Sequence, residues 1–153
     1  MLKVKMESTT EYPRLVKFFI EQGLEYDEDE MDFSNVLKAW KITQPGDFLV
    51  GGCMLVKREE HFVIQGIAVD PVLRKFGLGK ILMKKALTEA RTLGAEEIIL
   101  VARKPGFYKK PNFETVPWEV APDIFDCMDC PQRNVDCFPE VMKYAIPKEG
   151  PVL

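Results

Sequence analysis

The sequence predicts an α/β domain built around one sheet that contains both parallel and antiparallel strands. Two observations support this class. Apolar, β-branched segments of strand length alternate with segments whose apolar residues recur at helical spacing. Tight turn signals separate some of the strands, whereas a long helical segment lies between two others, which is how antiparallel and parallel neighbours are joined. The 153 residues, 46% of them hydrophobic and 29% charged, fit one globular domain.

Helices are expected where apolar residues recur every three or four positions. The first helix starts near Pro13, which suits a first helical turn, and Gly23 can end it. The longest helix is amphipathic and is followed by Gly94, which can terminate it. In chain order, the expected helical segments are 13–23, 31–40, 81–90 and 104–110.

Strands are expected where β-branched and apolar residues cluster between turn signals. Pro45-Gly46-Asp47 and Arg58-Glu59-Glu60 are two such turns. The strand between them contains Gly51 and Gly52, where another backbone can approach closely or a bulge can form. The last part of the chain is broken by prolines and is expected to hold two strands around a long irregular excursion. In chain order, the expected strands are 3–6, one before Pro45, 48–56, 61–69, 96–102 and two within 113–146.

The overall charge and hydropathy exclude several classes of protein. The chain has 21 Lys and Arg against 24 Asp and Glu, so it has no general electrostatic grip on nucleic acid. No apolar run approaches the ~20 residues of a membrane helix, and the N-terminus lacks a signal-peptide pattern. We therefore expect a cytoplasmic protein with one domain at residues 1–146 and a flexible tail at 147–153, with no nucleic-acid or membrane partner. A homodimer is left open.

The segment before the longest helix carries the most specific chemistry. Gly77 and Gly79 lie where that helix begins, so backbone N–H groups can approach a ligand closely there. Arg74, Lys75 and Lys80 add positive charge to the positive end of the helix dipole. This combination predicts a pyrophosphate site, although it is neither a Walker loop nor a Rossmann fingerprint.

Two motifs at this point resemble a known family. Arg74-x-x-Gly77-x-Gly79, after a strand that ends Ile67-Ala68-Val69-Asp70-Pro71, resembles the acetyl-CoA signature of the GNAT family of N-acetyltransferases. Gly106-Phe107-Tyr108-Lys109-Lys110-Pro111-Asn112-Phe113 is similar to the family's Phe-Tyr-x-x-x-Gly-Phe segment. The resemblance covers most of residues 1–120. It implies a mixed sheet of about six or seven strands, and an enzyme that moves an acetyl group from acetyl-CoA to a primary amine of a small molecule or peptide by direct attack.

The resemblance also implies roles for individual residues. Main-chain groups of Ile67 and Val69 would pair with the pantetheine arm of the cofactor, in a gap where two parallel strands splay apart. Tyr108 would protonate the departing CoA thiolate, since an unperturbed phenol pKa of ~10 lies close to a thiol's ~8.5. The cofactor-binding residues so implied are Ile67, Ala68, Val69, Arg74, Lys75, Phe76, Gly77, Leu78, Gly79 and Lys80.

Three positions depart from the family pattern. Gln65 stands where many members have Glu, and an amide cannot act as a general base. His61, four residues earlier on the same strand face, is the candidate base because imidazole titrates in a suitable range. A water-mediated route or no dedicated base is the alternative. Ala102 and Asn112 replace a CoA-contacting Asn and a Gly. Gln65 and Ala102 keep open a non-catalytic acetyl-CoA-binding module.

Two further features have several interpretations. Residues 25–32 hold six carboxylates, which would attract a cationic amine on the acceptor side or form a solvated loop. Cys127, Cys130 and Cys137 would bind zinc with a fourth ligand such as Cys53, exchange as thiols, or only pack, so a zinc or redox module is the second alternative. We assign no metal ligand from the sequence.

Overall fold

The computed structural model describes residues 2–24, 32–102, 113–122, 124 and 140–153. The helix expected at 104–110 and the cysteine-containing excursion fall outside these residues. In chain order, the elements are β1 (Lys5–Ser8), α1 (Tyr12–Glu21), β2 (Val36–Gln44), β3 (Phe48–Arg58), β4 (His61–Val69), the 3₁₀ helix η2 (Pro71–Phe76), α2 (Leu78–Thr92), β5 (Glu97–Ala102), β6 (Glu114–Val116) and β7 (Glu140–Ala145).

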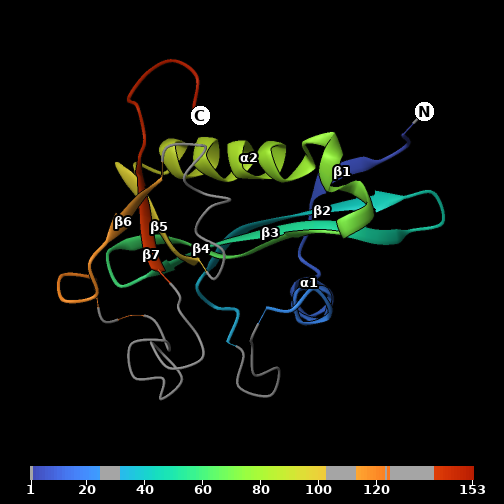
Figure 1. Cartoon of the computed structure of the whole chain (residues 1–153), viewed down its shortest axis with the longest axis horizontal. Helices are drawn as coiled ribbons and strands as arrows, with labels where there is room; N and C mark the ends of the chain where they lie inside the picture. Colours follow the sequence, from blue (N-terminus) through green and yellow to red (C-terminus); the bar gives the residue numbers. More distant parts are fainter. Residues whose placement is uncertain (1, 25–31, 103–112, 123, 125–139) are drawn as a thin grey trace.

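The described strands form one sheet of seven, in the order β1-β2-β3-β4-β5-β7-β6. Strands β4 and β5 are parallel and are connected through η2 and α2, whereas the other neighbours are antiparallel. Helix α2 covers one face of the sheet and α1 lies against the other (Figure 1). The predicted mixed sheet with flanking helices is confirmed.

Each face of the sheet buries its own hydrophobic cluster. The α2 face includes Leu82, Leu87 and Ile64, and the α1 face includes Phe19 and Val63. Gly52 of β3 lets α1 approach the sheet, because a Cβ at this position would lie 2.6 Å from Leu15 Cδ2. The close approach expected at this glycine therefore involves a helix side chain.

The short helix expected at 31–40 is wrong, because residues 36–44 form strand β2. A run such as Val36–Trp40 fits helical and extended periods about equally, and pairing decides between them. β2 pairs with β1 on one side and with β3 on the other, and Ile42 in its middle is fully buried. The turn at 45–47 is thus the tip of the β2–β3 hairpin.

Residues 147–153, which we expected to form a flexible tail, make specific contacts in the structure. Arg91 of α2 donates through Nη1 to the carbonyl oxygens of Pro147 and Gly150, at 3.1 and 2.8 Å. Val152 is 5% exposed within the α2-face cluster, and the Leu153 N–H donates to the Tyr144 hydroxyl at 2.9 Å. These contacts hold the tail against the end of α2.

The described α-helices, α1 with 10 residues and α2 with 15, are shorter than a membrane span. In the part of the chain that the structure describes, none of them is long and apolar enough to cross a bilayer. Helix α2, the longer of the α-helices in the described ranges, also has a polar outer face.

Candidate functional site

The parallel strands β4 and β5 diverge soon after they meet. In these two fully described strands, Val63 of β4 and Ile99 of β5 are the one pair of residues that lie opposite each other in register. β4 nevertheless continues to Val69, and it stays paired with β3 as far as the Gly51–Val69 partners. Beyond the Val63–Ile99 pair these two described strands share no further register partners, so the edge of β4 from Gly66 to Val69 diverges from β5, which is the splayed arrangement expected from the family resemblance.

The main chain of β4 directs specific groups into this gap. The Asp70 N–H donates to the Val50 carbonyl of β3 at 2.8 Å. Since successive residues of a strand direct their main-chain groups to opposite edges, Ile67 and Val69 direct theirs away from β3, toward β5. The Val69 carbonyl already accepts from Arg74 Nε at 3.1 Å. The N–H groups of Ile67 and Val69 are thus the donors that face the gap.

The turn after β4 ends in an uncapped helix start. The Asp70 carboxylate accepts from the Val72 N–H at 3.0 Å, and Pro71 follows Asp70. The segment after β4 therefore starts as the 3₁₀ helix η2. We did not expect this helix from the sequence, although the Asp-Pro pair is its signal. Gly77 then takes a left-handed conformation, with φ of 72°, and starts α2. No side chain caps this start and its first turn holds no acidic residue, so its N–H groups suit an anion.

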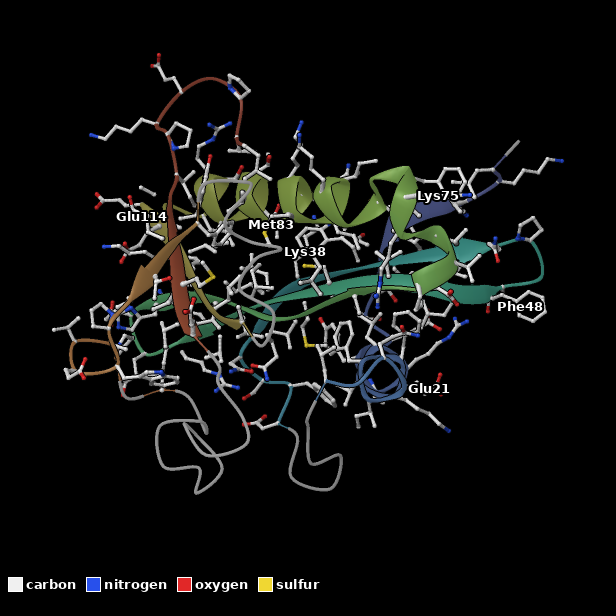
Figure 2. The ribbon with its side chains drawn as sticks, viewed as in Figure 1. Glu21, Lys38, Phe48, Lys75, Met83 and Glu114 are labelled. Atoms are coloured by element: carbon white, nitrogen blue, oxygen red, sulfur yellow. The ribbon has the colours of Figure 1, made fainter. Side chains whose placement is uncertain are left out.

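The ten predicted cofactor-binding residues include both buried and exposed side chains. Side chains of Ala68, Val69 and Leu78 are buried in the hydrophobic clusters, so these residues can offer a ligand only main-chain groups. Lys75 and Phe76 are exposed, and Lys75 Nζ lies 5.4 Å from the centre of the Phe76 ring. Lys75 lies at the end of the molecule where α2 begins (Figure 2).

The candidate base His61 lies well away from this gap. His61 is the first residue of β4 and pairs with Arg58 at the hairpin tip. At ~3.3 Å per residue, it lies ~20 Å along the strand from Ile67. It also precedes the Val63–Ile99 pair, where the gap is closed. This geometry gives little support to His61 as a base. Tyr108 lies outside the described residues.

A polar cluster that we did not predict surrounds Gln65. The β3–β4 pairing shifts between Met54–Gly66 and Leu55–Ile64, so Gln65 is the extra residue of a β-bulge. Arg58 Nη2 donates to Gln65 Oε1 at 2.5 Å, and Arg58 Nη1 donates to the Ile124 carbonyl at 2.8 Å. No sequence motif marks this contact, because it depends on the hairpin register and on the bulge.

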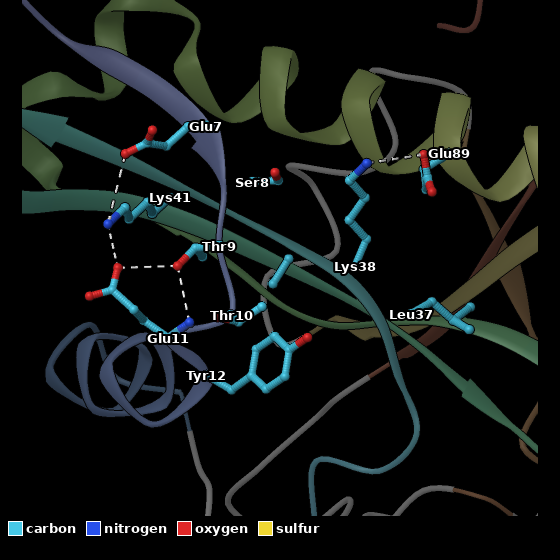
Figure 3. Close-up of a pocket in the computed structure, with 11 residues that line it drawn as sticks. Glu7, Ser8, Thr9, Thr10, Glu11, Tyr12, Leu37, Lys38, Lys41 and Glu89 are labelled. Atoms are coloured by element: carbon cyan, nitrogen blue, oxygen red, sulfur yellow. Dashed lines mark hydrogen bonds and ion pairs between the residues drawn. The ribbon is translucent and has the colours of Figure 1, made fainter.

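A hollow lies beside the edge strand β1 of the sheet, and none of the predicted site residues line it. It has a volume of about 630 Å³ and lies where the β1–α1 connection passes the start of β2 (Figure 3). An ion pair between Lys38 and Glu89, 3.8 Å apart, crosses one side of it. On the other side, Lys41 donates to Glu11 and pairs with Glu7. The hydrogen bond between Lys41 and Glu11 is the main cause that lowers the pKa of Glu11 and raises the pKa of Lys41.

Metal ligation by the described residues has no support in their geometry. In the described ranges, no group of three or more His, Cys, Asp or Glu could hold an ion. Cys53 is fully buried, and burial raises the pKa of its thiol to about 12, which disfavours the thiolate that zinc requires. The other three cysteines lie outside the described residues. Ala102 is also buried, at 1% exposure, so its methyl group packs in the core.

Comparisons with known proteins agree on one family. A family model described as "Acetyltransferase (GNAT) family" matches residues 6–113. An uncharacterized N-acetyltransferase of Chlorobaculum tepidum is 29% identical over 72 residues, so the match spans about half of each protein, 46% of either length.

Solved structures share the fold at lower identity. The ribosomal-protein-S18-alanine N-acetyltransferase of Escherichia coli superposes with a TM-score of 0.68 at 17% identity, over 97% of each chain. The N-acetylglutamate synthase of Neisseria gonorrhoeae, complexed with coenzyme A and N-acetyl-glutamate, gives 0.70 at 18% identity, over 96% of this chain and 36% of that one. These two likenesses establish the fold alone.

Proposed function

Because this chain belongs to the GNAT family of acetyltransferases, we propose that it moves an acetyl group from acetyl-CoA to a primary amine of a small molecule or peptide. The observation that carries the proposal is the gap between β4 and β5, which leads from the uncapped start of α2 along the Ile67 and Val69 N–H groups. A solved structure of the same fold contains coenzyme A, which supports an acyl-CoA donor.

The residues of the gap fit the two ends of this cofactor. The first-turn N–H groups of α2, together with Lys75 and Lys80, would hold the pyrophosphate through the helix dipole and positive charge. The outward N–H groups of Ile67 and Val69 would pair with the amide groups of the pantetheine arm. Arg74 would keep the Val69 carbonyl satisfied, as it does now.

Acetyl-CoA supplies the acetyl group as a thioester, and the chain's groups would act on the transfer. The amine nitrogen attacks the thioester carbonyl, so a C–N bond forms and the C–S bond breaks. Of the two outward N–H groups, those of Ile67 and Val69, the one that lies next to the thioester would stabilise the oxyanion, and the other would hold the arm. Tyr108 would give its proton to the thiolate, and the amine proton would pass to water, since Gln65 cannot accept it.

Charge reversal along α2 tests the cofactor site directly. Lys80→Glu places a carboxylate in the first helical turn and is expected to weaken acetyl-CoA binding about tenfold or more, measured by calorimetry. Lys85→Glu makes the same charge change on an exposed residue ~8 Å further along the helix, where the expected loss is much smaller. Equal losses in the two variants, or no binding of millimolar acetyl-CoA by the unmodified protein, would contradict the proposal.

A further inference from the structure

Arg58 is a half-buried cation without a carboxylate partner among the described residues. Those residues form six ion pairs, and Arg58 takes part in none of them. Its two hydrogen bonds go to neutral acceptors, the Gln65 amide oxygen and the Ile124 carbonyl. A guanidinium stays protonated and offers five N–H donors, so these two bonds leave both its charge and part of its donor set unmatched.

The guanidinium lies on the sheet face opposite α2. Val56, two residues earlier in β3, belongs to the α1-face cluster, and Ile124 packs against the same cluster. Alternation along the strand places Arg58 on that face as well. Its partner Gln65 is the bulged residue just past the last pair between β4 and β5. Arg58 therefore places its positive charge next to Gln65, at the end of the gap nearer the Val63–Ile99 pair and on the sheet face opposite α2.

This position has a consequence for the acceptor, if the proposed function holds. The cofactor phosphates would lie at the start of α2, and the arm would cross the sheet through the gap. The amine would then reach the thioester from the α1 face, near Gln65. A Glu at position 65 would pair with Arg58 and cancel its charge, whereas the amide leaves the charge uncompensated.

We propose that Arg58 is a specificity-determining residue of the acceptor site, and that it selects amines that also carry a carboxylate. The inference rests on the proposed function and narrows its substrate class to amino acids and acidic peptide ends. A carboxylate matches the planar guanidinium fork, and charge-assisted hydrogen bonds of this kind are about twice as strong as neutral ones. Gln65 holds the guanidinium in place through its amide oxygen.

The competing explanation is purely structural. Arg91 also donates to two neutral oxygens, and there its role is to hold the C-terminal tail. Arg58 would by analogy only fasten the segment around Ile124 to the sheet. Arg91 is consequently the matched control, because its loss costs a similar clamp and lies at the far end of α2 from the cofactor helix start.

The test compares acceptors that differ only in charge. Glycine is paired with glycinamide, and a peptide that begins with Asp is paired with one that begins with Asn. The measured quantity is the ratio of kcat/KM for the anionic and neutral member, compared between proteins so that differences in amine reactivity cancel. We expect Arg58→Met to lower this ratio about tenfold or more relative to the unmodified protein, for at least one pair. Arg91→Met should lower Tm and leave the ratio unchanged.

Two further variants keep the test decisive if Arg58→Met does not fold. Gln65→Glu supplies an internal carboxylate for Arg58 and should lower the ratio while Tm is maintained or raised. Arg58→Lys should retain part of the preference, because it keeps the charge and loses the fork. An unchanged ratio in the Gln65→Glu and Arg58→Lys variants would overturn the inference.

Failure of the proposed function gives a different pattern. If the unmodified protein acetylates none of these amines, the readout becomes binding of N-acetylglycine and N-acetylglycinamide in the presence of CoA, measured by ligand-detected NMR. Tighter binding of the anionic compound that is lost in Arg58→Met supports the inference without turnover. Equal binding of the two compounds overturns it.

Discussion

At the scale of single residues, the amide of Gln65 determines what its neighbours can do. It cannot accept a proton, so a direct base at this position is excluded by chemistry. It also offers Arg58 a neutral acceptor, whereas a carboxylate at this position would have neutralised the guanidinium charge. Under the proposed function, this one change from the family pattern would remove a general base and leave Arg58 available for a substrate carboxylate.

The sequence predicted only some of these residue roles, for a definite reason. Ile67 and Val69 could be assigned because a signature follows them directly, and the structure directs their main-chain groups into the gap. Arg58 could not be assigned, because its contact with Gln65 needs the hairpin register and the bulge, which no local pattern encodes. His61 was predicted from strand alternation and from the titration range of imidazole, and alternation gives the face of a residue but not its distance along the strand.

Tyr108 provides the sharpest prediction at this scale. Tyr108→Phe removes the hydroxyl that would protonate the CoA thiolate and keeps the ring. We expect kcat to fall about a hundredfold, within the usual range for a lost general acid, while the Kd of acetyl-CoA changes little. Phe107→Leu, at the neighbouring ring, is the control and should keep most of kcat. Equal kcat values for Tyr108→Phe and the unmodified protein would remove Tyr108 from the mechanism.

At the scale of secondary structure, turn residues and strand pairing determined which segments formed strands where hydrophobic periodicity was ambiguous. Segment 61–69 matched its predicted bounds because turn residues mark both ends. Segment 36–44 did not, because its apolar spacing fits helix and strand alike until β1 and β3 pair with it. The tail contacts of Arg91 and Val152 could not be predicted from local patterns either, since they join the C-terminal end of α2 and the core to residues far along the chain.

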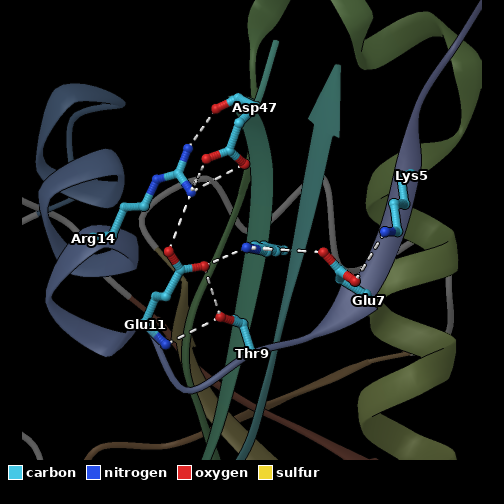
Figure 4. Close-up of polar contacts among 7 residues, drawn as sticks. Lys5, Glu7, Thr9, Glu11, Arg14 and Asp47 are labelled. Carbon is cyan, nitrogen blue, oxygen red and sulfur yellow. Dashed lines mark hydrogen bonds and ion pairs between the residues drawn. The ribbon is translucent and has the colours of Figure 1, made fainter. Parts of the chain in front are cut away.

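The start of α1 carries a prediction about pH. Glu11 accepts from Lys41 and from the Thr9 hydroxyl, and it pairs with Arg14, so β2, the β1–α1 connection and α1 meet at one carboxylate (Figure 4). The hydrogen bond from Lys41 is the largest cause that lowers the pKa of Glu11 below 4.5. Because the folded pKa is depressed, this stabilisation is complete above pH ~4.5 and is lost as pH falls through the folded value.

The variant Glu11→Gln should accordingly show a lower Tm than the unmodified protein at pH 7. The difference should shrink as the pH falls below 4.5, the ordinary value for this carboxyl group, and as salt rises. Thermal unfolding followed by circular dichroism from pH 7 to pH 3 measures both trends. Glu21→Gln, at the other end of α1 and outside the ion pairs of the described residues, is the control. A pH-independent difference would show that the charge of Glu11 does not contribute.

At the scale of the whole molecule, the net charge of −3 hides an uneven distribution. Basic residues Arg74, Lys75 and Lys80 gather at the start of α2, whereas six carboxylates lie within residues 25–32. The sheet separates the two faces on which a donor and an acceptor would arrive. Average composition therefore provides no general electrostatic attraction to nucleic acid, and it says nothing against a phosphate-bearing ligand at one helix start.

The sheet consists of two parts with little main-chain pairing between them. Strands β1 to β4 form one part and β5, β7 and β6 the other. Among the described residues the Val63–Ile99 pair joins their main chains, and hydrophobic clusters on both faces of the sheet pack side chains of the two parts together. A cofactor arm in the gap would connect them. At 100 times its Kd, a ligand adds about 2.7 kcal/mol of stability, which corresponds to a Tm rise of about 5–10 °C in a protein of this size.

Amide hydrogen exchange then locates the ligand within the molecule. Acetyl-CoA should slow exchange at Ile67 and Val69, whose N–H groups face the gap and have no strand partner there. Asp70 is the internal control, because its N–H already donates to Val50 and should be protected with or without ligand. A rise in Tm without new protection at Ile67 and Val69 would place the cofactor elsewhere. Protection confined to the first turn of α2 would mean that the phosphates bind there and that the arm does not cross the sheet.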